Sequence, residues 1–437
     1  MIRKIVRRKK FAFLLLFVFL VSGIRLIYWR TYPHIFVNAD TDSYYRVGQK
    51  IIGGQILIDD LRSPLYPLFL MLPALLNNRP ETAIYSPSFY RDMTVVILAQ
   101  SLLGLLSLLL TFRLAKKLGF SPAASYFFAL FMGLNIMVFS MERLLLTETL
   151  CGFIVLMFAN LLLSILNSYR PSKLFLMGLV AALLFLTKPV YFLLPLPVVM
   201  LLLLRYGKKF LFHGFLWLLS AALMTAGYIY LNFLNYGYTG LSRAGEIGLL
   251  GKIIIYKLDI SPANNNYYYP FLKQYLAENR ETHPFRFMDF ALPFYWDKKE
   301  KMNQLVPLVR SVILHNFPDY ITKTLREIPY GITEANNEVI LSTHGTRENR
   351  SIIFLYETYR YLQYSLLAII PIALWQVRSF FRKKNAASSK WLAVSLLALY
   401  HILLTVFIDY GEFGRVLSIS QVFSYLTVLY LLRPAYQ

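Results

Sequence analysis

Long apolar runs separated by short polar segments dominate the chain. The runs at 11–24, 174–186 and 193–204 contain almost no polar residue. A helix needs about 20 residues to cross roughly 30 Å of hydrocarbon, so this alternation predicts membrane-spanning helices. We predict ten spans, near 11–29, 92–112, 122–140, 147–167, 173–187, 190–205, 209–233, 352–376, 391–409 and 414–432. The predicted fold class is therefore an all-α polytopic membrane protein.

The polar segments between the runs differ in charge. Five of them are rich in Lys and Arg and contain no Asp or Glu: 3–10, 113–117, 170–173, 205–209 and 378–390. Short loops of this composition stay on the cytoplasmic side of a membrane. This rule places both chain termini inside and every acidic residue outside or at the outer edge of a span.

Composition supports a membrane protein and argues against a nucleic-acid partner. Hydrophobic residues make up 57% of the 437 residues and charged residues only 16%, whereas soluble domains contain about 25% charged residues. The net charge of +22 is concentrated in the short loops, so we predict no nucleic-acid binding. The N-terminal basic and apolar stretch resembles a signal peptide, but residues 25–30 offer no small-residue cleavage site. We interpret it as an uncleaved first span.

Two of the predicted outer segments are long. The first, 30–91, contains an apolar stretch at 65–76 that we expect to lie partly in the membrane. The second, 234–351, is predicted to form a small, mostly helical outer domain. The chain then divides into a seven-span membrane module at 1–233, the outer segment at 234–351 and a three-span module at 352–437.

The residues that could carry chemistry are carboxylates and cations of the outer face. The sequence has no Gly-rich nucleotide loop, no Cys/His metal spacing and no G-x-S-x-G elbow. Asp40 and Asp42 follow the first predicted span, and Tyr45 lies one helical turn further on. A carboxylate at a membrane edge can act as a general base, because partial desolvation raises its basicity. The alternative is N-capping of a helix by Asp42 or Ser43.

Three cations lie in the outer loops. Arg62 could bind a lipid phosphate through its planar fork of donors, or could snorkel to the lipid headgroups. Lys188 has no charged neighbour in sequence, which indicates an anionic partner in space. Arg415 is a second candidate for a lipid phosphate, and an ion pair with Asp409 or Glu412 is its alternative role.

Two further carboxylates, Glu142 and Glu148, flank a short outer turn. Either could position an acceptor or a metal ion. The alternative for Glu148 is a first-turn carboxylate that the helix dipole favours.

Taken in order, these segments resemble the GT-C superfamily of membrane glycosyltransferases. The resemblance is strongest to bacterial enzymes similar to protein O-mannosyltransferases and to the lipid A aminoarabinose transferase. It rests on Asp42-Ser-Tyr-Tyr-Arg, Gly53-Gly54, Arg62-Ser-Pro-Leu-Tyr-Pro67, Glu148, Thr187-Lys-Pro189 and Tyr410-Gly-Glu-Phe-Gly-Arg415. Two positions depart from the family pattern: Lys188 stands where Arg is usual, and the usual Pro-rich ending after Arg415 is absent. The resemblance does not extend to residues 234–351.

The resemblance implies a donor sugar carried on a polyprenyl phosphate. A hydroxyl of a lipid, glycan or protein acceptor would attack the anomeric carbon with inversion. In this scheme Asp42 takes the proton, with Asp40 as the alternative. The departing phosphate would be stabilised by three cations, Arg62, Lys188 and Arg415. The sugar or the acceptor would be placed by four further residues: Tyr45, Tyr66, Glu142 and Glu148. A divalent cation, Mg or Mn, would suit Asp40 and Asp42, and metal dependence stays open.

Two other functions remain open at this point. One is a glycan ligase or oligosaccharide transferase with a lipid-pyrophosphate donor. The other is a transporter or flippase of lipid-linked sugars, although transporters carry ionisable groups near the midplane, whereas here the charges lie at the outer rim. We expect an integral protein of the bacterial plasma membrane, acting on the periplasmic or outer face, or of the ER membrane in a eukaryote.

Overall fold

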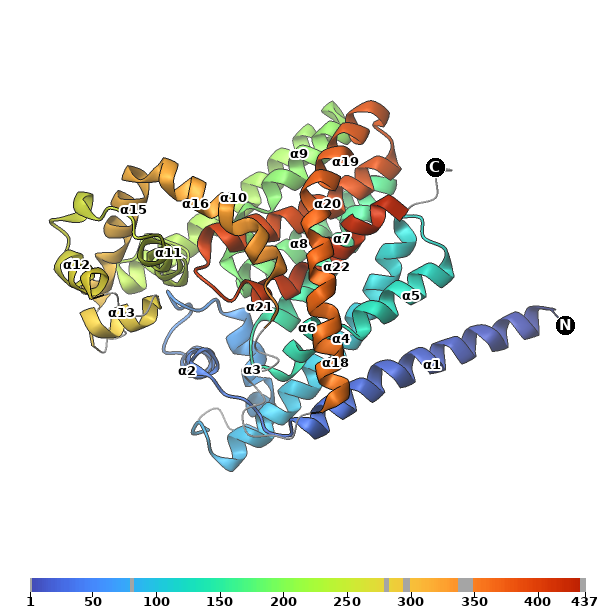
Figure 1. Cartoon of the computed structure of the whole chain (residues 1–437), viewed down its shortest axis with the longest axis horizontal. Coiled ribbons are helices and arrows are strands. Elements are labelled where there is room, and N and C mark those ends of the chain that lie inside the picture. The colour runs from blue at the N-terminus through green and yellow to red at the C-terminus, as the bar shows by residue number, and fades with distance from the viewer. Residues whose placement is uncertain (1, 79–81, 279–282, 294–298, 337–348, 433–437) are drawn as a thin grey trace.

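The computed structural model describes residues 2–78, 82–278, 283–293, 299–336 and 349–432 (Figure 1). Within these ranges every regular element is a helix, and no strand occurs. The first helix, α1 (Ile2–Thr31), extends away from a bundle formed by the later apolar helices. The predicted all-α class is confirmed.

Seven helices of the described ranges are long and apolar enough to cross a membrane. They are α4 (Pro87–Lys117), α7 (Glu148–Asn167), η2 with α9 (Pro189–Tyr206), α10 (Lys208–Tyr236), α18 to α19 (Arg350–Lys383), α20 (Ala386–Ile408) and α21 to η7 (Phe413–Leu432). A pair bent by 55°, α5 (Pro122–Gly133) followed by Ile136–Arg143, makes an eighth if it is one span. The shorter apolar helix α8 (Pro171–Thr187) has 17 residues. Each of the ten predicted spans lies on one helix or on consecutive helical segments, and the number ten stays a prediction.

The core of the bundle lies around α7 and α20. About 67% of the α7 span and 61% of the α20 span are buried inside the protein, against 17% for α10. One continuous cluster of buried apolar side chains joins α4, α7, α8, α9, α20 and α22 (Gln421–Leu429). The helices that begin or end beside the site described below are therefore the most constrained ones.

The two predicted outer segments are helical. In the first, α2 (Ala39–Ile52) is followed by α3 (Leu65–Leu76), which coincides with the predicted apolar stretch. The second contains α11 (Arg243–Tyr256), α12 (Tyr269–Ala277), α13 (Pro284–Ala291), α14 (Lys299–Asn303), α15 (Leu305–His315) and α16 (Phe317–Thr333). Figure 1 shows α11, α12, α13 and α15 gathered beside the bundle, above α2. These helices share a buried apolar cluster that also includes Leu61 of the first outer segment.

The acidic outer turns lie together at one place in the structure, and the basic loops lie together at another. Among the basic segments, Arg205 donates a hydrogen bond of 2.8 Å to the carbonyl of Lys384, and Lys390 contacts the Asn167 side chain at 3.0 Å. The outer segments meet instead around Asp40, as described below. This separation is what the predicted threading requires; which compartment each face contacts stays a prediction.

A buried ion pair anchors α1 to the bundle. The Arg25 guanidinium binds both carboxylate oxygens of Glu142, at 2.6 and 2.8 Å, and also donates to the carbonyls of Val21 and Gly133. A Cβ at Gly104 would collide with the Glu142 carboxylate, so α4 can approach only because this residue is glycine. Glu142 is thereby committed to holding α1.

We expect Arg25→Ala to destabilise the protein by about 3–5 kcal/mol, because it leaves the Glu142 charge buried and unpaired. The double variant Arg25→Met/Glu142→Leu removes both charges and should recover most of that loss. Thermal unfolding in detergent would measure both. A double variant as unstable as Arg25→Ala would contradict the assigned role of the pair.

Candidate active site

Five of the residues singled out from the sequence converge in one cluster, although they come from distant segments. Arg62 Nη2 lies 2.5 Å from Asp40 Oδ1, and Arg415 Nη1 lies 3.5 Å from Asp40 Oδ2. Lys188 Nζ lies 3.1 Å from Glu148 Oε1, and Arg415 Nη1 lies 3.9 Å from the same oxygen. Arg415 therefore bridges the two carboxylates and joins the first outer segment to α7.

Helix α2 forms a cradle for Arg62. Asn38 caps the helix by accepting a hydrogen bond from the Thr41 amide at 2.8 Å, so the alternative of Asp42 or Ser43 as N-cap is wrong. The Ser43 hydroxyl accepts from Arg62 Nε at 3.0 Å, and the Tyr44 ring lies 4.4 Å from the guanidinium carbon. Asp40, Ser43 and Tyr44 have the i, i+3, i+4 spacing that places side chains on one helix face.

Glu148 and Arg415 each have a buried polar atom that forms no hydrogen bond with any described residue. Glu148 is the first residue of α7, and it is 4% exposed. Its Oε2 and the Nε of Arg415 have no hydrogen-bond partner in the described structure. A polar group buried without a partner is costly, so the cluster is suited to a polar ligand that supplies the missing contacts.

The charges of the cluster perturb two carboxyl groups in opposite directions. Burial disfavours the ionised form of Asp40, but Arg62 and Arg415 outweigh it and lower the Asp40 pKa to about 2. Burial raises the pKa of Asp409, which follows α20, to about 6 against the lowering effect of Arg415. Asp40 is therefore ionised at neutral pH, whereas Asp409 changes its protonation state at a pH close to neutral.

Asp42 lies apart from this cluster. It forms an i, i+4 ion pair with the exposed Arg46 at 2.8 Å. Residues two positions apart on a helix point to different sides, so Asp40 and Asp42 do not converge on one cation. No group of three or more His, Cys, Asp or Glu side chains with metal-binding spacing occurs among the described residues. Since Asp40 already faces two arginines, this pair of aspartates does not fit the divalent-cation site considered from the sequence.

The two tyrosines predicted to place the sugar lie in the core. Tyr45 is fully buried and packs edge-on against Phe89, with ring centroids 4.9 Å apart. Tyr66 is also fully buried and donates a hydrogen bond of 2.9 Å to Gln100. Tyr66 packs edge-on against Tyr44 and supports the face that holds Arg62. The residue predicted from the sequence was Tyr45, whereas the tyrosine that contacts the cluster is Tyr44.

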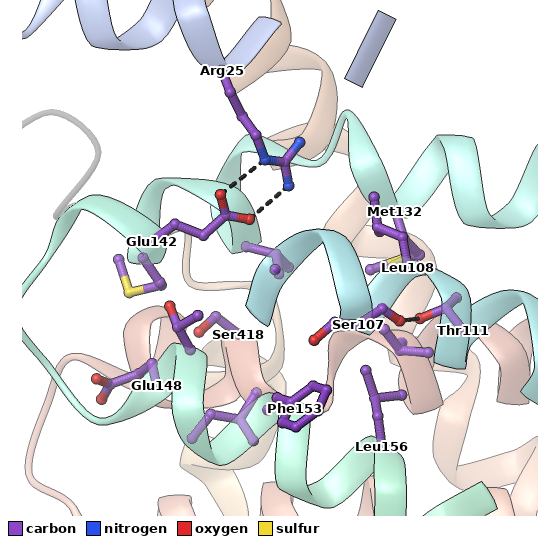
Figure 2. A pocket seen from close by; sticks show the side chains of 17 residues that line it. Arg25, Ser107, Leu108, Thr111, Met132, Glu142, Glu148, Phe153, Leu156 and Ser418 are labelled. Atoms are coloured by element: carbon purple, nitrogen blue, oxygen red, sulfur yellow. Dashed lines mark hydrogen bonds and ion pairs between the residues drawn. The ribbon is translucent and has the colours of Figure 1, made fainter. Parts of the chain in front are cut away.

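A small cavity of about 60 Å³ lies beside Glu148 (Figure 2). Glu142 and Glu148 both line it, together with Thr149, Phe153 and Ser418 among others. Figure 2 shows the Glu142 carboxylate turned toward Arg25 rather than toward Glu148. Both oxygens of Glu142 already accept hydrogen bonds from Arg25. This pairing does not favour the predicted role of Glu142 in placing an acceptor.

Ser43 and Tyr44 are the site residues that the sequence interpretation missed. Starting the helix face from Asp40 instead of Asp42 would have included them, since Tyr44 lies four residues after Asp40. The alternative ion pair predicted for Arg415 is also present, because its Nη2 contacts Glu412 at 2.6 Å. Arg415 therefore pairs within its own turn and also reaches Asp40.

Comparison with known proteins supports the class that the sequence suggested. Residues 64–230 match the model of the family described as dolichyl-phosphate-mannose-protein mannosyltransferase. This match supports the predicted resemblance to the GT-C superfamily of membrane glycosyltransferases. No curated protein matches the chain in sequence.

Three solved structures of the Archaeoglobus fulgidus oligosaccharyltransferase are similar to the chain, each with a TM-score below 0.5. The apo form is 12% identical, with a TM-score of 0.46 over 94% of this chain and 50% of that one. The complex with an inhibitory peptide and a dolichol-phosphate is 12% identical, with a TM-score of 0.45 over 96% of this chain and 50% of that one. The form tethered to an acceptor peptide is 11% identical, with a TM-score of 0.48 over 96% of this chain and 49% of that one. The chain spans about half the length of these structures.

The cluster itself predicts how a charge change alters anion binding. Asp40→Asn should bind a short-chain prenyl phosphate more tightly than wild type, by roughly three- to tenfold, because Arg62 and Arg415 lose their competing carboxylate. Calorimetric titration in detergent would measure this. Asp42→Asn is the matched control and should leave the affinity unchanged. Weaker binding in Asp40→Asn would mean that Asp40 is needed to order the arginines.

Proposed function

We propose that this protein transfers a sugar from a lipid-linked phosphate donor to an acceptor hydroxyl at the membrane surface. The observation that carries the proposal is the convergence of Arg62, Lys188 and Arg415 on the half-buried Asp40 and the buried Glu148 at the edge of the spans. The description of the matched family, which names a dolichyl-phosphate sugar, supports a lipid monophosphate as the carrier.

The cations suit the leaving group of this reaction. The acceptor oxygen forms a bond to the anomeric carbon from the side opposite the phosphate, with inversion. The bond between that carbon and the phosphate oxygen breaks, and its electron pair leaves with the lipid phosphate. Arg62, Lys188 and Arg415 would stabilise the negative charge that grows on this phosphate in the transition state. Arg62 and Arg415 can each offer two parallel donors, whereas Lys188 acts as a point charge.

Asp40 is the proposed general base. It is ionised at neutral pH and lies beside the cations that would hold the phosphate. When the donor phosphate engages Arg62 and Arg415, these cations stabilise the Asp40 carboxylate less, and its basicity rises. The acceptor hydroxyl proton would pass to Asp40 as the new bond forms. Asp42, paired with Arg46 outside the cluster, takes no part in this scheme.

The finer assignments follow from the same scheme. Glu148 would orient the sugar or the acceptor through its unmatched oxygen. The acceptor is a lipid, a glycan or a protein, and the site faces the periplasm, the cell exterior or the ER lumen. The proposed mechanism assigns no step to a divalent cation.

Replacement of the base should separate the two aspartates. We expect Asp40→Asn to lower the rate of transfer by about 10²- to 10⁴-fold, the range of a lost general base, and Asp42→Asn to leave the rate within about threefold of wild type. Radiolabelled polyprenyl-phosphate sugars supplied to membranes, without nucleotide, would report both rates.

Three outcomes would change this assignment. A rate that collapses in Asp42→Asn but not in Asp40→Asn would move the base to Asp42. Transfer only from lipid-pyrophosphate glycans would instead identify a glycan ligase or an oligosaccharide transferase. Movement of intact lipid-linked sugar across vesicles without transfer would identify a flippase.

The titration of Asp409 predicts a pH dependence of donor binding. As pH rises through about 6, Asp409 becomes ionised and its charge competes with the donor phosphodiester for Arg415. The donor KM should therefore rise several-fold between pH 5 and pH 7.5. The phosphodiester keeps one charge throughout this range, and Glu412, Lys188 and Lys252 are the other charged groups near Asp409. Asp409→Asn should hold the KM at its low value; an equal rise in this variant would exclude Asp409 as the cause.

A further inference from the structure

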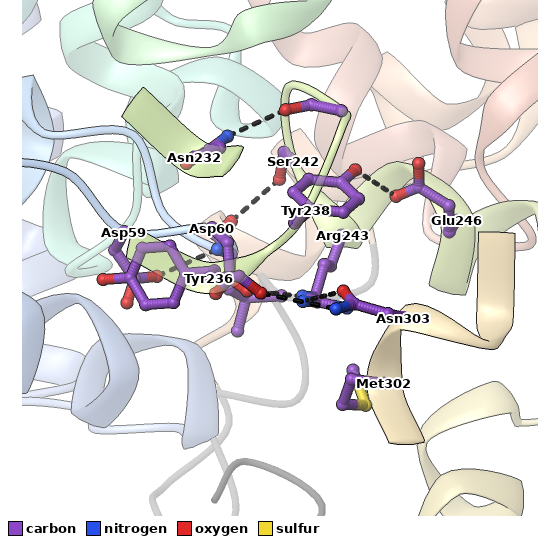
Figure 3. A network of polar contacts seen from close by, with 12 residues as sticks. Asp59, Asp60, Asn232, Tyr236, Tyr238, Ser242, Arg243, Glu246, Met302 and Asn303 are labelled. Carbon is purple, nitrogen blue, oxygen red and sulfur yellow. Dashed lines mark hydrogen bonds and ion pairs between the residues drawn. The ribbon is translucent and has the colours of Figure 1, made fainter. Parts of the chain in front are cut away.

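The outer domain binds the first outer segment through Arg243, the first residue of α11 (Figure 3). Arg243 is 3% exposed, and its guanidinium pairs with the Asp60 carboxylate. Arg243 Nη2 also donates a hydrogen bond of 2.7 Å to Asn303, and the guanidinium lies 4.6 Å from the centre of the Tyr238 ring. Figure 3 shows Asn303 and Tyr238 on either side of the arginine.

Main-chain contacts hold the same segment. The Arg243 amide donates to the Asp60 carbonyl at 2.7 Å, and the Ser242 hydroxyl donates to the Leu61 carbonyl at 2.9 Å. The Tyr236 hydroxyl donates to the Ile58 carbonyl at 2.9 Å. The chain from 58 to 61 is therefore bound along its length by the beginning of the outer domain.

This segment leads directly to Arg62. Asp59 Oδ1 accepts hydrogen bonds from the amides of Leu61 and Arg62, at 2.9 and 2.8 Å. The Leu61 side chain is buried in the apolar cluster of the outer domain. The main chain of Arg62 is thus fixed from the outer domain, while its side chain is fixed by α2.

The same helix also contacts the turn that carries Arg415. A Cβ at Gly248 would collide with the Ile408 carbonyl, and a Cβ at Gly251 would collide with Tyr410. Helix α11 can lie against this turn only because both positions are glycine. Further along, Lys252 Nζ lies 4.9 Å from the centre of the Phe413 ring. One helix therefore contacts the segment before Arg62 at its first residue and the segment before Arg415 at its middle.

We infer that α11 sets the position of Arg62 relative to Arg415, and that Arg243 is a positioning residue for the transfer reaction. The inference rests on the proposed function, because it assigns the two arginines to the leaving phosphate. An arginine that has to meet a developing charge contributes most when its geometry is set in advance. Arg243 contacts neither the lipid nor the sugar in this scheme and acts through Asp60 and the 58–61 segment.

The kinetic test compares Arg243→Gln, Arg243→Lys and Tyr268→Phe with wild type. Arg243→Gln should lower kcat for transfer at least about tenfold with little change in the acceptor KM, since the lost contact matters in the transition state. Arg243→Lys keeps the charge opposite Asp60 and should recover most of the rate. Tyr268→Phe removes only the hydroxyl that contacts Met302 in the outer-domain core and leaves the pairing of Arg243 with Asp60 in place, so it should behave as wild type.

Amide hydrogen exchange tests the inference without turnover. In Arg243→Gln, exchange should accelerate in peptides covering 58–62 and stay unchanged in α12. Wild-type protein that transfers no sugar from any lipid phosphate would refute the proposed function, and the exchange result would still decide the contact. Unchanged kcat in Arg243→Gln would overturn the inference. Faster exchange throughout the outer domain, or no change at 58–62, would overturn it too, because Arg243 would then have a general structural role or none.

Discussion

Charge pairing at the edge of an apolar bundle is the constraint on which this structure depends. Charged groups taken out of water are costly unless they are paired, and five of them meet where Arg415 lies between Asp40 and Glu148. Each comes from a segment that must end at one level for the pairs to form. The pairing therefore sets the register of the helices, and it also concentrates cations at the position proposed for the donor phosphate.

A second buried pair shows the same principle used for architecture alone. Arg25 binds both carboxylate oxygens of Glu142, and this pair ties α1 to the bundle. Glu148, six residues after Glu142, keeps one oxygen without a partner among the described residues. The two carboxylates line one cavity, and what distinguishes their roles is how completely each is satisfied.

In the proposed scheme the helices of the 234–351 segment support the site, although none of their described residues belongs to the charged cluster. Its buried cluster includes Leu61, and its first helix lies against the turn that precedes Arg415. Small residues at 248 and 251 let this helix approach closely, which makes the contact sensitive to side-chain size. A rigid connection of this kind is a reason for a membrane transferase to retain a domain outside its bundle.

The sequence by itself determined the helical membrane fold, the placement of most spans and the set of candidate charges, because hydrophobic length and loop charge are local properties of the chain. Only the tertiary structure decided which candidates meet. Asp40 rather than Asp42, and Tyr44 rather than Tyr45, face the cluster because α2 is capped at Asn38 and turned so that this face meets Arg62. Residues one or two positions apart on a helix point in different directions, and the direction that faces a partner depends on packing between segments far apart in sequence. The partners of Glu142 and Arg243 were hidden for the same reason, since Arg25 and Asp60 lie 117 and 183 residues away along the chain.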